Sequence, residues 1–118
     1  MLQTLSKAQK KAARSLIDLA LERECQQFIR VLSDMSQKPL EPVDRPNHSR
    51  YLELFKSMDS FDKRLVQRYD GITGGRYLET VAFLFAEGWL TEDDLALCDD
   101  EMREEILRYN AVLTRMRE

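Results

Sequence analysis

The fold of this chain is decided by residues 77–90, which read YLETVAFLFAEGWL. Ten of these fourteen residues are apolar, and at helical spacing they fall on every face. A helix that is apolar all round must be surrounded by protein, and this run is too short to cross a bilayer. We therefore expect a helix over residues 74–88 that lies at the centre of a helical bundle.

Two longer helices are expected before this stretch. Residues 5–35 contain no glycine or proline, and their apolar residues recur at intervals of three and four. This periodicity predicts an amphipathic helix, with Thr4 or Ser6 as its cap. The same periodicity predicts a helix over residues 48–69. Three prolines between the two helices predict an extended connecting loop over residues 36–47.

The C-terminal part of the chain contains two trios of acidic residues, each followed by an apolar residue. Acids in a first turn stabilise the positive end of the helix dipole, so we expect a short helix over residues 91–97 and a longer one over residues 99–116. Thr91 and Asp94 approximate a capping box. No segment alternates like a strand, so we expect an all-α bundle of four main helices and one short helix, forming a single domain over residues 1–118.

The segment YDGITGGRYLE, residues 69–79, holds three of the four glycines and could be a phosphate loop or a corner between helices. A phosphate loop follows a strand, whereas a helix is expected here, and no GxGxxG or GK[ST] motif is present. We favour the corner, with Gly71 as a left-handed helix end and Thr73 as the next cap. Free amides beside an arginine leave a weak anion contact as an alternative, at Thr73, Gly74, Gly75 and Arg76.

Catalytic chemistry has little support in this sequence. The single histidine, His48, excludes sites that need two imidazoles. Acids one helical turn apart, Asp59 with Asp62 and Glu101 with Glu104, leave a metal-dependent hydrolase as a minor hypothesis. Solvated helix faces explain both pairs more simply, so we expect no catalytic residue, metal ligand, cofactor or small-molecule substrate.

The cysteines and the N-terminal residues indicate the cellular compartment of the protein. Cys25 and Cys98 lie far apart and neither belongs to a CxxC pair, which favours reduced thiols in an intracellular protein. The N-terminal residues lack the apolar run of a secretory signal, and no apolar run reaches the length of a membrane span. We expect a cytoplasmic protein that does not enter a membrane.

Charge is distributed unevenly along the chain. The net charge of −3 disfavours a dedicated nucleic-acid binder. The start of the chain is basic, however, and residues 91–105 are strongly acidic, which leaves open whether the acidic segment binds a cation or a basic partner. The candidate charged interaction surfaces are Lys7, Lys10, Lys11, Arg14, Glu92, Asp93, Asp94, Asp99 and Asp100.

These patterns predict a binding protein rather than an enzyme. The long first helix, the five methionines and the ten aromatic residues favour a non-catalytic protein-interaction or structural module. Its expected partner is a second copy of itself or another protein. The alternatives are a nucleic-acid-associated accessory protein that uses Lys7, Lys10, Lys11 and Arg14, and the hydrolase with clustered carboxylates.

Overall fold

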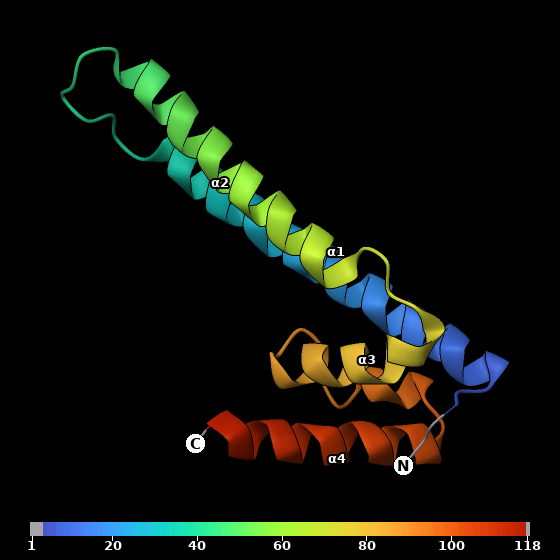
Figure 1. Ribbon diagram of the computed structural model, residues 1–118. Helices are drawn as coiled ribbons and strands as arrows, with labels where there is room; N and C mark the ends of the chain where they lie inside the picture. The colour runs from blue at the N-terminus through green and yellow to red at the C-terminus, as the bar shows by residue number, and fades with distance from the viewer. Residues whose placement is uncertain (1–3, 118) are drawn as a thin grey trace. The chain divides into compact units, whose positions relative to one another are not determined.

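The computed structural model describes residues 4–117 (Figure 1). Across these residues the chain forms four α-helices and two 3₁₀-helices and contains no strand, which confirms the all-α class. The elements are α1 (Lys7–Gln37), α2 (Pro46–Tyr69), η1 (Gly74–Arg76), α3 (Tyr77–Ala86), η2 (Asp94–Leu97) and α4 (Asp100–Arg117).

The predicted boundaries differ from the observed ones mainly around α3. The predicted helix over residues 74–88 begins as the 3₁₀ turn η1 and ends two residues early, at Ala86. It ends there because Gly88 takes a left-handed conformation with φ 89°. The Gly88 N–H donates to the Phe85 carbonyl (3.1 Å), and the Trp89 N–H donates to the Leu84 carbonyl (3.0 Å). Together these two bonds form a Schellman motif. The predicted short helix over residues 91–97 is likewise only the 3₁₀ turn η2.

Three predicted caps have different outcomes. Ser6 caps α1: its hydroxyl accepts the Gln9 N–H (3.1 Å), and its own N–H donates to the Gln9 side chain (2.9 Å). Gly71 is left-handed with φ 70°, as predicted, and follows the end of α2. The predicted cap at Thr73 is wrong, because the N-cap residue of α3 is Arg76, which makes no side-chain cap bond.

The chain divides into two compact units, and α1 contributes to both. One unit comprises Met1–Arg23 and Gly71–Glu118 and is called the three-helix unit; the other is Glu24–Asp70 and is called the hairpin unit. The expectation of a single domain over residues 1–118 stays a prediction. Each unit is described by itself below.

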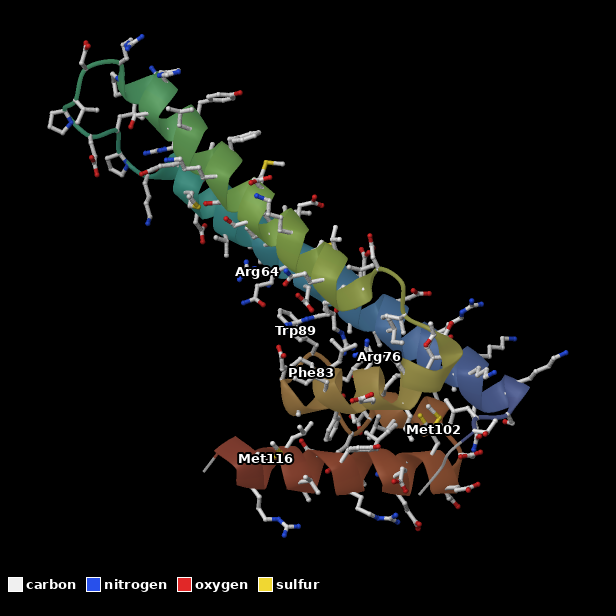
Figure 2. The ribbon with its side chains drawn as sticks, in the orientation of Figure 1. Arg64, Arg76, Phe83, Trp89, Met102 and Met116 are labelled. Carbon is white, nitrogen blue, oxygen red and sulfur yellow. The ribbon has the colours of Figure 1, made fainter. Side chains whose placement is uncertain are left out.

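The three-helix unit holds nearly all of the buried apolar side chains. α3 packs against α4, and Met102 of α4 points toward α3 (Figure 2). The first part of α1 contributes to the core with the fully buried residues Ala13 and Ala20. The largest fully buried side chains are Leu16, Val81, Leu84, Leu95, Met102 and Ile106.

The apolar stretch that predicted a central helix is only partly enclosed. Leu84 is fully buried, but Phe83 is 41% exposed and Trp89 is half-buried. Phe83 points away from α4 (Figure 2). The expectation that this helix is covered on every face is therefore wrong at Phe83, and its central position stays a prediction.

The hairpin unit consists of the second part of α1 and the antiparallel α2 (Figure 1). Phe28 and Phe61 stack across the two helices with ring centroids 4.0 Å apart. At one end, the Glu24 carboxylate accepts bonds from Arg68 (2.6 Å) and from the Tyr69 hydroxyl (2.7 Å). The pKa of the Tyr69 hydroxyl is raised, mainly by burial and also by its hydrogen bond to Glu24.

Arg50 organises the loop end of the hairpin unit. Its guanidinium donates to the carbonyls of Ser36 (3.0 Å), Lys38 (2.9 Å) and Pro39 (3.3 Å). The Ser36 carbonyl is one that the end of α1 leaves without a helical donor, and the other two carbonyls follow the helix. The segment between the two helices is shorter than the predicted loop over residues 36–47, because α1 runs to Gln37 and α2 begins at Pro46.

Candidate protein-interaction surface

Large apolar side chains line the outside of α2. Tyr51, Phe55 and Met58 follow one another at intervals of four and three, and so lie on one side of the helix. Leu52 and Val66 extend this side. All five side chains are between 41% and 61% exposed. We call these five residues the α2 stripe: Tyr51, Leu52, Phe55, Met58 and Val66.

The stripe exists because the apolar face of α2 is wider than α1 can cover. Leu54 and Leu65 share a helical side with Phe61, the residue that stacks on Phe28 of α1. That side faces α1, and the stripe lies beside it. Phe61 is the only buried residue of the hairpin unit, all of whose residues the structure describes. One layer of two helices therefore leaves most of its apolar residues in contact with water.

The stripe is large enough to matter energetically. A buried aromatic side chain removes about 150–250 Å² from water, so the exposed parts of the five side chains sum to roughly 500 Å². Contiguous apolar patches of several hundred Å² on a protein surface mark interaction sites. The exposed apolar area of the α2 stripe is of this size.

Charged residues beside and within the stripe balance one another, and Asp62 lies one helical turn from both Met58 and Val66. Lys56, Asp59 and Lys63 follow at intervals of three and four along one flank, where the Lys63 ammonium lies 2.9 Å from the Asp59 carboxylate. Between Tyr51 and Val66, three acids are matched by three basic residues. These are Glu53, Asp59 and Asp62 against Lys56, Lys63 and Arg64.

A groove of about 410 Å³ lies at the loop end of the hairpin unit. Its walls mix apolar residues such as Met35 and Leu40 with charged ones such as Glu53 and Lys56. The Arg50 guanidinium in its wall is already bonded to three carbonyls. The groove exists because Arg50 holds the loop in place. The polar groups in its walls do not converge on one point.

The predicted anion contact lies at η1. Thr73, Gly75 and Arg76 are exposed there, and the Arg76 N–H already donates to the Thr73 carbonyl (2.9 Å). Gly74 belongs to the same short turn. This bond uses the backbone N–H of Arg76 within the chain, and the anion contact stays a prediction.

The predicted basic surface lies at the start of α1. Lys7, Lys10 and Lys11 are exposed there. Arg14 instead has a partner in the three-helix unit: its Nε donates to the Tyr77 hydroxyl (3.0 Å), and its guanidinium lies 5.9 Å from the centre of that ring.

The predicted acidic surface is partly used for structure. Glu92, Asp93 and Asp100 are exposed. The Asp99 carboxylate accepts the Met102 N–H (2.8 Å), which caps α4, and also the Gln9 side-chain amide (3.0 Å). Gln9 belongs to the α1 capping box, so Asp99 joins the beginnings of two helices.

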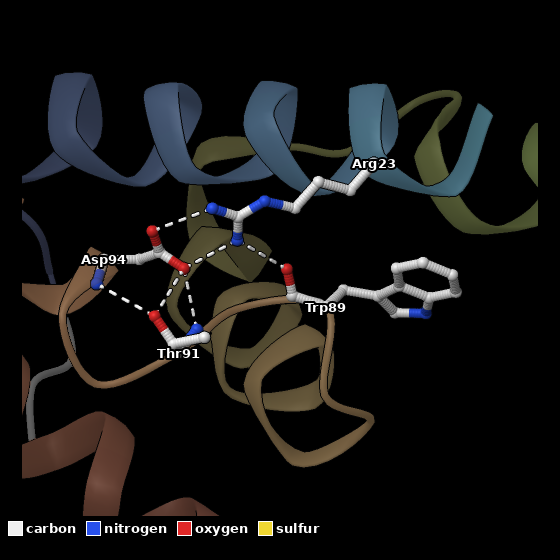
Figure 3. Close-up of polar contacts among 4 residues, drawn as sticks. All are labelled: Arg23, Trp89, Thr91 and Asp94. Carbon is white, nitrogen blue, oxygen red and sulfur yellow. Dashed lines mark hydrogen bonds and ion pairs between the residues drawn. The ribbon is translucent and has the colours of Figure 1, made fainter. Parts of the chain in front are cut away.

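A polar network surrounds Asp94 in the three-helix unit (Figure 3). The Arg23 guanidinium donates to both carboxylate oxygens, at 2.6 and 3.0 Å, and to the Trp89 carbonyl at 2.9 Å. Asp94 also accepts the Thr91 N–H (2.7 Å) and hydroxyl (3.0 Å), which confirms the predicted capping pair. The bond from Arg23 holds the pKa of Asp94 well below its usual value.

Asp94→Asn is expected to destabilise the protein by about 1–2 kcal/mol at neutral pH, because it removes a bidentate, charge-assisted pair. This loss of stability is modest because the Arg23 side chain is 36% exposed. The folded pKa of Asp94 lies below the unfolded value near 3.8, so this stabilisation is complete above that pH and is lost as pH falls below it.

The measurement is urea unfolding of the parent and of Asp94→Asn at pH 7, 5 and 3. The difference in unfolding free energy should hold from pH 7 to 5 and shrink at pH 3. A difference that is the same at all three pH values would contradict the role given to the Arg23–Asp94 pair.

The other side chains considered for catalysis or metal binding do not form a cluster within the described residues. Burial, with a contribution from Asp99, raises the pKa of the Cys98 thiol to about 11. His48 is exposed, and its ring stacks near that of Tyr51 with centroids 6.4 Å apart. No group of three or more His, Cys, Asp or Glu residues within the described part of the chain is placed to hold a metal ion. Among the same residues, no helix has the length and hydropathy of a membrane span.

The comparisons with known proteins give no relative for this chain: no protein-family model, curated protein or solved structure matches it.

The α2 stripe is the feature that sequence reasoning missed. Its residues were predicted to lie in a helix, but no interaction surface was predicted there. The available signal was the width of the apolar face: Leu54, Phe61 and Leu65 lie on one side, and Tyr51, Phe55 and Met58 on the next.

Proposed function

We propose that this protein is a non-catalytic protein-interaction module that associates with itself through the α2 stripe. One observation carries the proposal: the hairpin unit buries a single residue, Phe61, while five large apolar side chains of α2 remain exposed. Contact with another surface would remove those side chains from water, which is favourable.

The area of the stripe agrees with this proposal. Two copies in contact would bury roughly 1,000 Å² from their stripes, which is the lower bound for a specific interface. At about 25 cal/mol per Å², that burial is on the order of 25 kcal/mol before the cost of association. Loss of rigid-body and side-chain freedom offsets much of this gain, so we expect association at micromolar concentrations rather than a very tight complex.

Light scattering across a dilution series of the full chain tests the proposal. We expect a mass of about twice 13.9 kDa at high concentration, falling toward 13.9 kDa on dilution. Because the driving force is apolar burial, the association should persist when the salt concentration is raised. A mass of 13.9 kDa at every concentration would remove the proposed self-association.

A further inference from the structure

We infer that two copies place α2 against α2 in antiparallel orientation about a twofold axis, so that their hairpin units together form a four-helix bundle. This inference rests on the proposed self-association and specifies its geometry. It starts from the partial burial of the hairpin unit, in which only Phe61 is buried.

A second hairpin supplies the missing layer. Helices bury an apolar face by packing into at least two layers around a core, which a lone pair of helices cannot provide. The stripe lies directly beside the side of α2 that packs on α1. A helix seated on the stripe would therefore extend the existing Phe28–Phe61 core rather than begin a separate one.

The balance of charge favours a second copy as the occupant. The segment from Tyr51 to Val66 carries three acids and three basic residues, so two copies of it do not repel each other. A twofold contact is self-complementary and is the commonest symmetry among soluble oligomers. A partner of strongly acidic or basic character would find no excess of opposite charge on this surface.

The order of charges along the flank favours the antiparallel orientation. When antiparallel helices are centred between residues 57 and 58, Lys56 of each copy lies opposite Asp59 of the other, and Leu52 lies opposite Lys63. In a parallel arrangement about a twofold axis, the flank with Lys56 and Asp59 would lie on opposite sides of the contact in the two copies, so these residues would not pair across it. Opposite charges across an interface set orientation, whereas like charges there disfavour it.

Disulfide cross-linking of the full chain tests the orientation. Leu52 and Lys63 lie on the same flank of α2, about 16 Å apart along the helix axis. A disulfide needs Cα atoms within about 7 Å. Leu52→Cys and Lys63→Cys are made separately, each with Cys25→Ser and Cys98→Ser, and are oxidised alone and as an equimolar mixture.

The antiparallel pairing predicts a covalent dimer in the mixture, containing one copy of each variant, and little covalent dimer from either variant alone. Covalent dimers from each variant alone would overturn the antiparallel orientation. Association by light scattering without any cross-link would overturn this geometry and leave the proposed self-association standing. A monomeric parent protein would overturn both.

Charge reversal gives a second measurement that does not use cysteine. Lys56→Asp and Asp59→Lys change exposed side chains and should leave the fold intact. Each variant alone brings like charges together across the α2–α2 contact, whereas their mixture pairs opposite charges. We expect the mixture to associate about tenfold more tightly than either variant alone, as two restored surface ion pairs would give. Equal affinities for the mixture and the two variants would overturn the pairing of Lys56 with Asp59 across the contact.

Discussion

Phe55→Glu combined with Met58→Glu is expected to raise the dissociation constant for self-association by about 100-fold or more. Both side chains lie in the middle of the α2 stripe and are more than half exposed. The change removes apolar area from the contact and would bury carboxylates without partners. A loss of about 3 kcal/mol corresponds to the expected change in affinity.

The matched control is Ser60→Glu, which adds a carboxylate at an exposed position on the opposite side of α2. Light scattering on a dilution series should show the parent and Ser60→Glu associating alike, and the double variant as a monomer. Circular dichroism should show equal helix content in all three, because each substituted residue is exposed. If the double variant associates like the parent, the contact lies on another surface.

Leu84→Ala is expected to destabilise the three-helix unit by about 2–5 kcal/mol. Leu84 is fully buried in the same unit as Val81, Met102 and Ile106. Truncation would leave a cavity that close packing cannot fill without moving α3 relative to α4.

The neighbouring substitution Phe83→Ala is the control, because Phe83 is 41% exposed. We expect Phe83→Ala to lower the unfolding free energy by only about 1 kcal/mol, since much of the ring is already in contact with water. Urea or thermal unfolding measures both changes. Equal costs for the two substitutions would show that α3 is enclosed on both sides, as its apolar sequence first suggested.

The polar network around Asp94 contains one pair that could be predicted from the local sequence and one that could not. Thr91 and Asp94 are three residues apart, so their capping pair could be predicted. Arg23 is 71 residues from Asp94 in the chain, and nothing in its local sequence indicates this partner. The packing of the first part of α1 in the three-helix unit brings the guanidinium to the carboxylate.

The sequence by itself determined what depends on neighbours along the chain. Apolar residues and acidic first turns predicted the four α-helices, and prolines predicted the loop after α1. A cap at Thr4 or Ser6 and a helix end at Gly71 were also predicted, because side-chain spacing and backbone freedom act over a few residues.

Only the tertiary structure decided which apolar faces are covered. Periodicity states that a face is apolar, whereas burial depends on how many helices pack against it. Thus Leu84 is buried while the adjacent Phe83 is partly exposed, and Phe61 is buried while Phe55 on the same helix faces water. Burial is set by contacts between residues distant in sequence, and for that reason the α2 stripe emerged only from the folded chain.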